Sequence, residues 1–367
     1  MTSVDIDVNV RQLSSRQNAF DFLRLLAAVA VVVQHTNAAL GTHFAWGLFD
    51  LIDGVPMFFI ISGMLIYSSA ESIHSRTGQF RQFYWNRYLR IAPAIYAFAI
   101  LTPIILVLFG AVKPSSLVSP QILVWLGSSA ALLPNYHPSI WDGIGTGSMN
   151  DPLYTIPAEF SFYLIVPILV LVAHRFGFWK MLVPFLAVGV AGSLAYYVTL
   201  GHSGVLSTVL DHSFLERGAC FAVGIFWAKY WGRIPVKWWL IALALAAYLF
   251  LKIFATGSFY AAFKPILLSI PMSYLIVTFG YLAPKFFYRF TKRLGDLSFA
   301  TYIWQYVVIN LVLWFGLKGE WWQTLLVLVI TLGVAALSWY FIEKPSQRFK
   351  KISLRDRPIL RAASYAK

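Results

Sequence analysis

The sequence predicts an all-α integral membrane protein with about ten transmembrane helices, and its composition carries that prediction. Apolar residues (Ala, Val, Ile, Leu, Met, Phe, Trp, Tyr and Cys) make up 59% of the 367 residues. Charged residues make up 12%, about half their share in soluble domains, and the mean hydropathy is +0.68. Aromatic residues reach 17%, with 14 Trp, which is typical of proteins anchored at two membrane–water interfaces. So few charges cannot cover a soluble surface.

Ten apolar runs, separated by charged or Pro- and Gly-rich breaks, come close to the 17–25 residues or so that a helix needs to cross the hydrocarbon core. The run 239–254 is short and needs Lys252 and flanking aromatic residues to reach the interfaces. The runs lie near 20–40, 51–70, 91–112, 153–173, 181–200, 214–231, 239–254, 264–283, 297–317 and 321–342.

A shorter run, 122–135, is predicted to form a re-entrant or interfacial helix on the outer side rather than an eleventh span, since its 14 residues are too few. With ten spans and a cytoplasmic N-terminus, 23 of the 29 Lys and Arg residues fall in cytoplasmic segments and 4 in outer loops. Cytoplasmic loops carry an excess of Lys and Arg, so we expect both termini to be cytoplasmic. An eleventh crossing would send the basic C-terminus outside.

The chain is therefore divided into a cytoplasmic segment 1–19, a transmembrane domain 20–342 and a basic cytoplasmic tail 343–367. The net charge of +14 belongs to the cytoplasmic loops and tail, where it serves topology and lipid contact, and nucleic-acid binding is not needed to explain it. The single cysteine, Cys220, rules out a disulfide within the chain and a Cys-based zinc site. We predict no metal site and a buried, structural Cys220.

The first run carries Arg24 and, deeper in the span, His35. Their spacing of eleven places them on one helix face, roughly 16 Å apart along the axis, with Arg24 near the cytoplasmic end. Ionisable groups inside a span are costly and are candidates for function. The structural alternative is an arginine extended to the interface and a histidine hydrogen-bonded between helices.

Two arginines, Arg87 and Arg90, lie at the cytoplasmic start of the third run. Residues three apart share a helix face, and two planar guanidinium groups suit a phosphate ligand. The alternative is that both arginines only set the topology.

Carboxylates also occur inside predicted spans. Glu159 lies about a third of the way into its span from the outside, where it must pair, coordinate or take up a proton. A structural ion pair or a protonated, hydrogen-bonded acid is the alternative. Adjacent residues diverge by about 100° on a helix, so Glu216 and Arg217 need not pair with each other, and we expect structural pairing with other helices rather than a chemical role.

Taken together, these segments resemble the acyltransferase 3 family, integral membrane enzymes that O-acylate carbohydrates, over nearly the whole chain. The family's Arg-x10-His and Arg-x-x-Arg motifs are matched by Arg24 with His35 and by Arg87 with Arg90. Four further stretches follow the family's patterns in order: GVPMFFIISGMLIY (54–67), LYTIPAEFSFYLIVP (153–167) with Glu159, LGDLSFATYIWQ (294–305) and FIEKP (341–345).

Two positions depart from the family pattern. Gln305 replaces the histidine that ends the late motif, and Pro56 stands where the second span often carries an acid. Neither residue can take part in acid–base chemistry, which leaves His35, with Glu159 as the carboxylate. The chain ends soon after its last run, so we expect a stand-alone form without the esterase-like domain fused to some relatives.

The resemblance implies an O-acyltransferase of the cytoplasmic (inner) membrane. The donor substrate would be cytoplasmic acyl-CoA, by default acetyl-CoA, with no permanently bound cofactor, and the acceptor a hydroxyl of a cell-surface or exported carbohydrate. Arg24, Arg87 and Arg90 would bind CoA, His35 would act as base or be acylated transiently, and Glu159 would orient its ring. A transporter or flippase of a glycan or lipid-linked intermediate and a non-catalytic scaffold are the alternatives.

The long outer loop 135–152 is the candidate contact for the carbohydrate acceptor. Tyr136, Trp141 and Asp142 combine aromatic faces with a polar group, which suits stacking on sugars and hydrogen bonding to them. Anchoring at the membrane interface explains the aromatic residues equally well.

Overall fold

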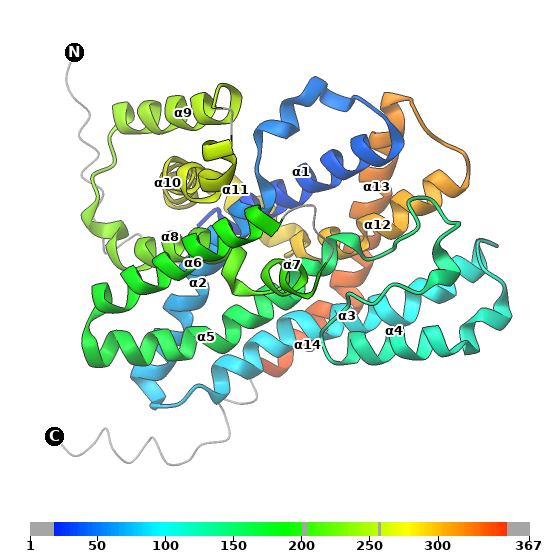
Figure 1. Cartoon of the computed structure of the whole chain (residues 1–367), viewed down its shortest axis with the longest axis horizontal. Helices are drawn as coiled ribbons and strands as arrows, with labels where there is room; N and C mark the ends of the chain where they lie inside the picture. The colour runs from blue at the N-terminus through cyan, green and yellow to red at the C-terminus, as the bar shows by residue number, and fades with distance from the viewer. Residues whose placement is uncertain (1–17, 200–203, 256–257, 351–367) are drawn as a thin grey trace.

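The protein is all-helical in the parts that its computed structural model describes, residues 18–199, 204–255 and 258–350 (Figure 1). This confirms the predicted fold class. Most of the predicted N-terminal segment 1–19 and of the basic tail 343–367 lies outside the described residues.

A helix occupies the place of every one of the ten apolar runs. The helices are α1 (Phe20–Leu40), α2 (Gly54–Thr77), α3 (Arg81–Leu108), α5 (Thr155–Phe176), α6 (Phe178–Thr199), α8 (Phe214–Tyr230), α9 (Trp238–Ile253), α10 (Ser258–Leu282), α12 (Ser298–Trp314) and α13 (Trp321–Ser338).

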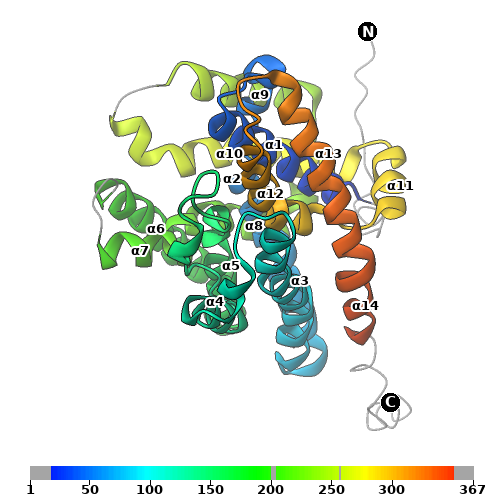
Figure 2. The same ribbon diagram turned by 90° about the vertical axis from the view of Figure 1, so that its right-hand side faces the viewer.

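Shorter elements connect or extend these helices. The α-helical ones are α4 (Pro120–Ala130), α7 (Val205–Asp211), α11 (Lys285–Leu294) and α14 (Lys344–Gln347). The 3₁₀ turns are η1 (Phe44–Leu51), η2 (Pro114–Val118), η3 (Ser139–Trp141), η4 (Asp151–Tyr154), η5 (Trp231–Arg233) and η7 (Arg348–Lys350). A π-helical turn, η6 (Trp339–Glu343), continues α13 into α14 along one side of the molecule (Figure 2).

Seven helices in the described ranges are long and apolar enough to cross a membrane, or eight if α11 and α12, bent by 60°, form one span. Helices α8 and α12 have 17 residues and α9 has 16, which is short of a full crossing. The number of crossings and the cytoplasmic placement of the termini therefore stay predictions.

Contacts between helix ends agree with the predicted alternation. His74 near the end of α2 lies edge-on to His174 near the end of α5, with ring centroids 5.5 Å apart. Lys229 near the end of α8 lies 3.9 Å from Glu71 of α2. The loops 71–90, 174–180 and 229–238, all predicted to be cytoplasmic, thus begin at one end of the bundle.

Glycines allow the helices of the α2, α6 and α8 group to approach closely. A Cβ at Gly63 of α2 would collide with the backbone of Phe221 in α8, and one at Gly189 of α6 would collide with the backbone of Gly218. Small residues let helix backbones meet where lipid supplies no hydrophobic driving force. This packing fixes the first turns of α2 and α8, which line the cavities described below.

The short helix predicted near 122–135 is present as α4, which lies alongside α3 (Figure 1). Pro103 has no N–H to donate to the Ala99 carbonyl one turn earlier in α3. The buried Trp125 of α4 supplies the missing donor, with its indole Nε1–H 2.9 Å from that oxygen. A backbone defect in α3 is thus repaired by the helix that packs on it.

Candidate functional site

Asp296 connects two of the predicted functional arginines. Its carboxylate accepts from Arg24 Nη1 of α1 at 3.2 Å and from Arg90 Nη1 of α3 at 2.5 Å, and it also accepts from the Ser298 hydroxyl at 2.7 Å. Asp296 lies at the bend between α11 and α12. We did not select it from the sequence, where the signal was an acid in a loop otherwise rich in Lys and Arg.

Arg87 and Arg90 of α3 have buried nitrogen donors without hydrogen-bond partners among the described residues. Arg90 Nη2 and Arg87 Nε are buried without a hydrogen-bond partner among the described residues. The Arg87 guanidinium lies 5.6 Å from the Phe83 ring and 5.8 Å from the Tyr163 ring, and its Nη2 is 3.4 Å from Ser69 Oγ. Buried donors without partners are costly, and so they mark a place suited to an acceptor-rich ligand.

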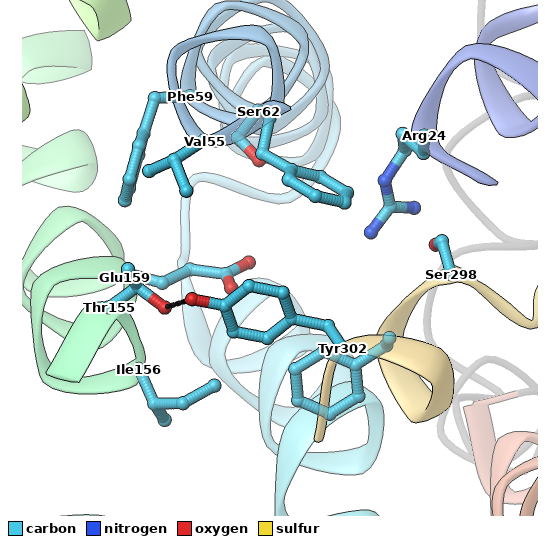
Figure 3. A pocket seen from close by; sticks show the side chains of 11 residues that line it. Arg24, Val55, Phe59, Ser62, Thr155, Ile156, Glu159, Ser298 and Tyr302 are labelled. Atoms are coloured by element: carbon cyan, nitrogen blue, oxygen red, sulfur yellow. Dashed lines mark hydrogen bonds between the residues drawn. The ribbon is translucent and has the colours of Figure 1, made fainter. Parts of the chain in front are cut away.

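Arg24 and Glu159 line one small pocket from opposite sides (Figure 3). The cavity measures about 40 Å³ and is bounded by α1, α2, α5 and the start of α12. Tyr302 closes one wall, with its hydroxyl 2.5 Å from the Pro152 carbonyl and 2.9 Å from Thr155 Oγ1. Such a volume holds a water molecule, so a larger substrate requires the helices to move apart.

Glu159 is hydrogen-bonded within its own helix rather than to His35. The Tyr163 hydroxyl, one turn further along α5, donates to Glu159 Oε1 at 2.5 Å. Because the Tyr163 ring also lies beside the Arg87 guanidinium, the three side chains form a row from the pocket to α3. The predicted contact of Glu159 with the His35 imidazole is therefore not among the hydrogen bonds described.

His35 is paired instead with Gln305, the residue that departs from the family pattern. His35 Nδ1 is 3.0 Å from Gln305 Oε1, and the amide Nε2 of the fully buried Gln305 donates to the Tyr302 carbonyl at 3.0 Å. That second bond orients the amide so that its oxygen faces the imidazole, and an oxygen can only accept. Nδ1 therefore carries the proton, and the Nε2 lone pair has no hydrogen-bond partner among the described residues. The ring of Tyr306 lies edge-on to the imidazole, with centroids 5.3 Å apart.

The predicted acceptor residues are spread over buried and exposed positions of the 135–152 loop. Trp141 is fully buried, with its ring 4.7 Å from that of Trp125. Asp142 is exposed and lies 2.7 Å from His137 Nε2, while Tyr136 is half-buried. Packing accounts for Trp141 in this structure, which leaves Tyr136 and Asp142 as the accessible members of the set.

Glu216 and Arg217 are hydrogen-bonded to each other, and Arg217 also pairs with neighbouring elements, as the sequence leads us to expect. Arg217 Nη2 also reaches the Tyr154 hydroxyl at 3.1 Å and lies 3.8 Å from Asp211. Among the described residues, no group of three or more His, Cys, Asp or Glu could hold a metal ion.

Comparison with known proteins identifies relatives along the whole chain. It is 27% identical to nodulation protein 10 of Rhizobium leguminosarum bv. viciae, over 92% of this chain and 95% of that protein. It is 29% identical to an O-acetyl transferase of Shigella phage Sf6, over 90% of this chain and 96% of the relative. Peptidoglycan O-acetyltransferase OatA of Listeria monocytogenes is 24% identical over 90% of this chain, which spans about half of OatA (56%).

No solved structure matches the chain. The profile of an acyltransferase domain, Acyl_transf_3, matches residues 17–340, which include Arg24, His35, Arg87, Arg90 and Glu159. With the helical membrane architecture, this match shows that the chain belongs to the acyltransferase 3 family.

Proposed function

We propose that the protein transfers an acyl group, most simply acetyl, from cytoplasmic acyl-CoA to a hydroxyl of a cell-surface or exported carbohydrate. The observation that carries the proposal is the imidazole of His35, held by Gln305 with Nε2 free, on the same helix as Arg24. The names of the relatives, which include O-acetyl transferases, support acetyl as the group transferred.

The donor is proposed to bind at the arginines. CoA carries a diphosphate and a 3′-phosphate, which are matched by planar guanidinium groups. The unpartnered Arg87 Nε and Arg90 Nη2 are donors for these oxygens, and Arg24 faces the pocket that the thioester would enter. Because the cavity is small, donor binding has to separate α2 and α5 from the start of α12.

His35 is proposed to act as the general base. Nε2 takes the proton of the sugar hydroxyl while the hydroxyl oxygen attacks the carbonyl carbon of the thioester. A new C–O bond forms between the sugar and the acyl group, and the C–S bond to CoA breaks. The proton then passes from Nε2 to the CoA thiolate. The Gln305 amide holds the ring in the required tautomer. Glu159 supplies negative charge to the pocket that Arg24 also lines, and it accepts from Tyr163, whose ring lies beside the Arg87 guanidinium.

The proposal predicts that His35→Ala reduces acetyl transfer by roughly 10²–10⁴-fold, the usual contribution of a positioned base. The assay uses purified full-length protein in lipid nanodiscs with radiolabelled acetyl-CoA and a carbohydrate acceptor. His43→Ala, at an exposed position after α1, is the matched control and should keep wild-type rates. Thermal unfolding with and without acetyl-CoA shows whether each variant is folded and binds the donor.

Near-normal transfer by His35→Ala would contradict the mechanism. Wild-type protein that neither transfers acetyl nor gains thermal stability from acetyl-CoA would instead favour the alternative function, transport of a glycan or lipid-linked intermediate, because a carrier needs no CoA site.

A further inference from the structure

A second cavity, of about 330 Å³, lies apart from the pocket of Arg24 and Glu159. It is formed by the first turns of α2 and α8, the last turns of α6 and the first half of α10, which are the ends that the sequence predicts to face outward. Its volume falls at the lower end of the roughly 300–1,000 Å³ found for small-ligand pockets. The lining residues that could bind a ligand through polar or aromatic groups are Asp53, Tyr196, Tyr197, Glu216, Arg217 and Lys264.

Two of the lining residues have polar atoms without partners. Glu216 is 5% exposed, and its Oε2 has no hydrogen-bond partner among the described residues, although Oε1 is bonded to Arg217. Arg217 Nε is likewise buried and unpaired in the described part of the chain. Polar atoms buried in this way are normally satisfied by protein, water or ligand, and here both residues line a cavity large enough to hold a ligand.

The charges of the cavity favour a neutral, hydroxyl-rich ligand. Asp53, Glu216, Arg217 and Lys264 line the cavity. With the ion-pair partners Lys252 of Asp53 and Asp211 of Arg217, three carboxylates balance three cations, so an anionic lipid headgroup would meet no excess of positive charge. Sugar hydroxyls both donate and accept, and they can therefore satisfy both kinds of group. Tyr196 and Tyr197 add aromatic faces for the apolar side of a sugar ring.

The cavity also adjoins the proposed catalytic pocket. Asp53 and Pro56 line the cavity, while Val55 and Phe58 in the same turn of α2 line the pocket. On the α5 side, Arg217 donates to the Tyr154 hydroxyl, and the next residue, Thr155, lines the pocket. A sugar in the cavity would thus lie one layer of side chains from the place where the thioester is expected.

We propose that this cavity, rather than the 135–152 loop, binds the carbohydrate acceptor from the outer side. The proposal rests on the proposed function for the identity of its ligand. Chitotetraose, a neutral oligosaccharide, serves as the probe, and binding is measured independently of transfer.

The binding test places a cysteine at position 197 in a Cys220→Ser background, which is nearly isosteric and leaves no other thiol. Because Cys220 itself lines the cavity, the Kd of chitotetraose is measured in this background. In spheroplasts, a membrane-impermeant maleimide should label Tyr197→Cys. Chitotetraose at ten times its Kd should slow the labelling by roughly tenfold, because the fraction of sites left free is 1/(1 + [L]/Kd). Lys318→Cys, exposed between α12 and α13, is the control whose labelling should not respond to the sugar. Absence of labelling from outside, or labelling unaffected by the sugar, would overturn the site.

The kinetic test uses Lys264→Gln, which should raise the KM for chitotetraose by roughly tenfold through loss of a charged hydrogen bond and leave the KM for acetyl-CoA unchanged. Lys318→Gln is the matched control, and Asp142→Asn is the parallel variant for the loop. A raised sugar KM in Asp142→Asn but not in Lys264→Gln overturns the cavity site and leaves the proposed function intact. Protection of Tyr197→Cys without any acetyl transfer by the wild-type protein supports the site and overturns the proposed function.

Discussion

Gln305 departs from the family pattern, and the proposed mechanism gives it the role of holding the imidazole of His35. A glutamine cannot move a proton at this position, but its amide oxygen accepts from His35 Nδ1, and its amide nitrogen is fixed by the Tyr302 carbonyl. An imidazole held in this way is a base at Nε2 without needing a carboxylate partner. In the proposed mechanism Gln305 is a positioning residue, and its contact with His35 could not be predicted from the sequence, because it depends on how α1 packs against α12.

We predict that Gln305→Leu lowers kcat by roughly 10–100-fold with little change in either KM, because the ring loses its tautomer and orientation while the substrate contacts remain. Gln305→Glu restores an acceptor for Nδ1–H and should recover much of the lost kcat. Steady-state kinetics in nanodiscs measure both variants. If the leucine and glutamate variants lose equal activity, the residue serves packing rather than positioning.

At the scale of elements, the bend between α11 and α12 brings Asp296 to α1 and α3 at once. The sequence predicted the arginines and their helix faces, since periodicity and spacing fix those locally. It did not predict the ion pairs of Asp296 with both arginines, which we call the Asp296 bridge. These ion pairs depend on how three helices that are distant in the sequence pack together. Glu159 is a similar case. Its position inside a helix was predicted from the sequence, whereas its hydrogen bond with Tyr163 was found only in the structure.

We predict that Asp296→Asn destabilises the protein by roughly 3–5 kcal/mol, the cost of leaving buried charges unpaired, with a corresponding fall in Tm. The three side chains are mostly buried, with exposures of 11–17%. Added coenzyme A should recover part of the lost Tm, because its phosphates supply negative charge to Arg24 and Arg90. Tryptophan fluorescence during heating gives the measurement.

The matched control is Asp142→Asn, which removes an exposed carboxylate from its pair with His137 and should change stability by about 0.5 kcal/mol or less. An unchanged Tm in Asp296→Asn would mean that the bridge adds nothing to the packing of α1, α3 and α12.

The ten helices at the apolar runs were all predicted from the sequence, because each run is apolar enough to be recognised without its neighbours. The sequence did not locate their packing partners, the amphipathic α11 or the cavity among α2, α6, α8 and α10, because these depend on contacts between runs that look alike in composition. The side of the membrane reached by each loop follows from charge counting and is the part of the architecture that most needs a direct test.

The decisive element for that topology is α4, because every later loop changes sides if α4 crosses the membrane. Its 11 residues span roughly 16 Å, about half the hydrocarbon thickness. Its Trp125 donates a hydrogen bond to the Ala99 carbonyl of α3. In a Cys220→Ser background, we predict that Lys113→Cys and Asp142→Cys, exposed on either side of α4, both react with an impermeant maleimide in spheroplasts. Lys180→Cys, at the predicted cytoplasmic start of α6, should react only after the membrane has been permeabilised. Opposite behaviour of the first two positions would make α4 a crossing, and the reversed later loops would then conflict with the contacts that join the ends of α2, α5 and α8.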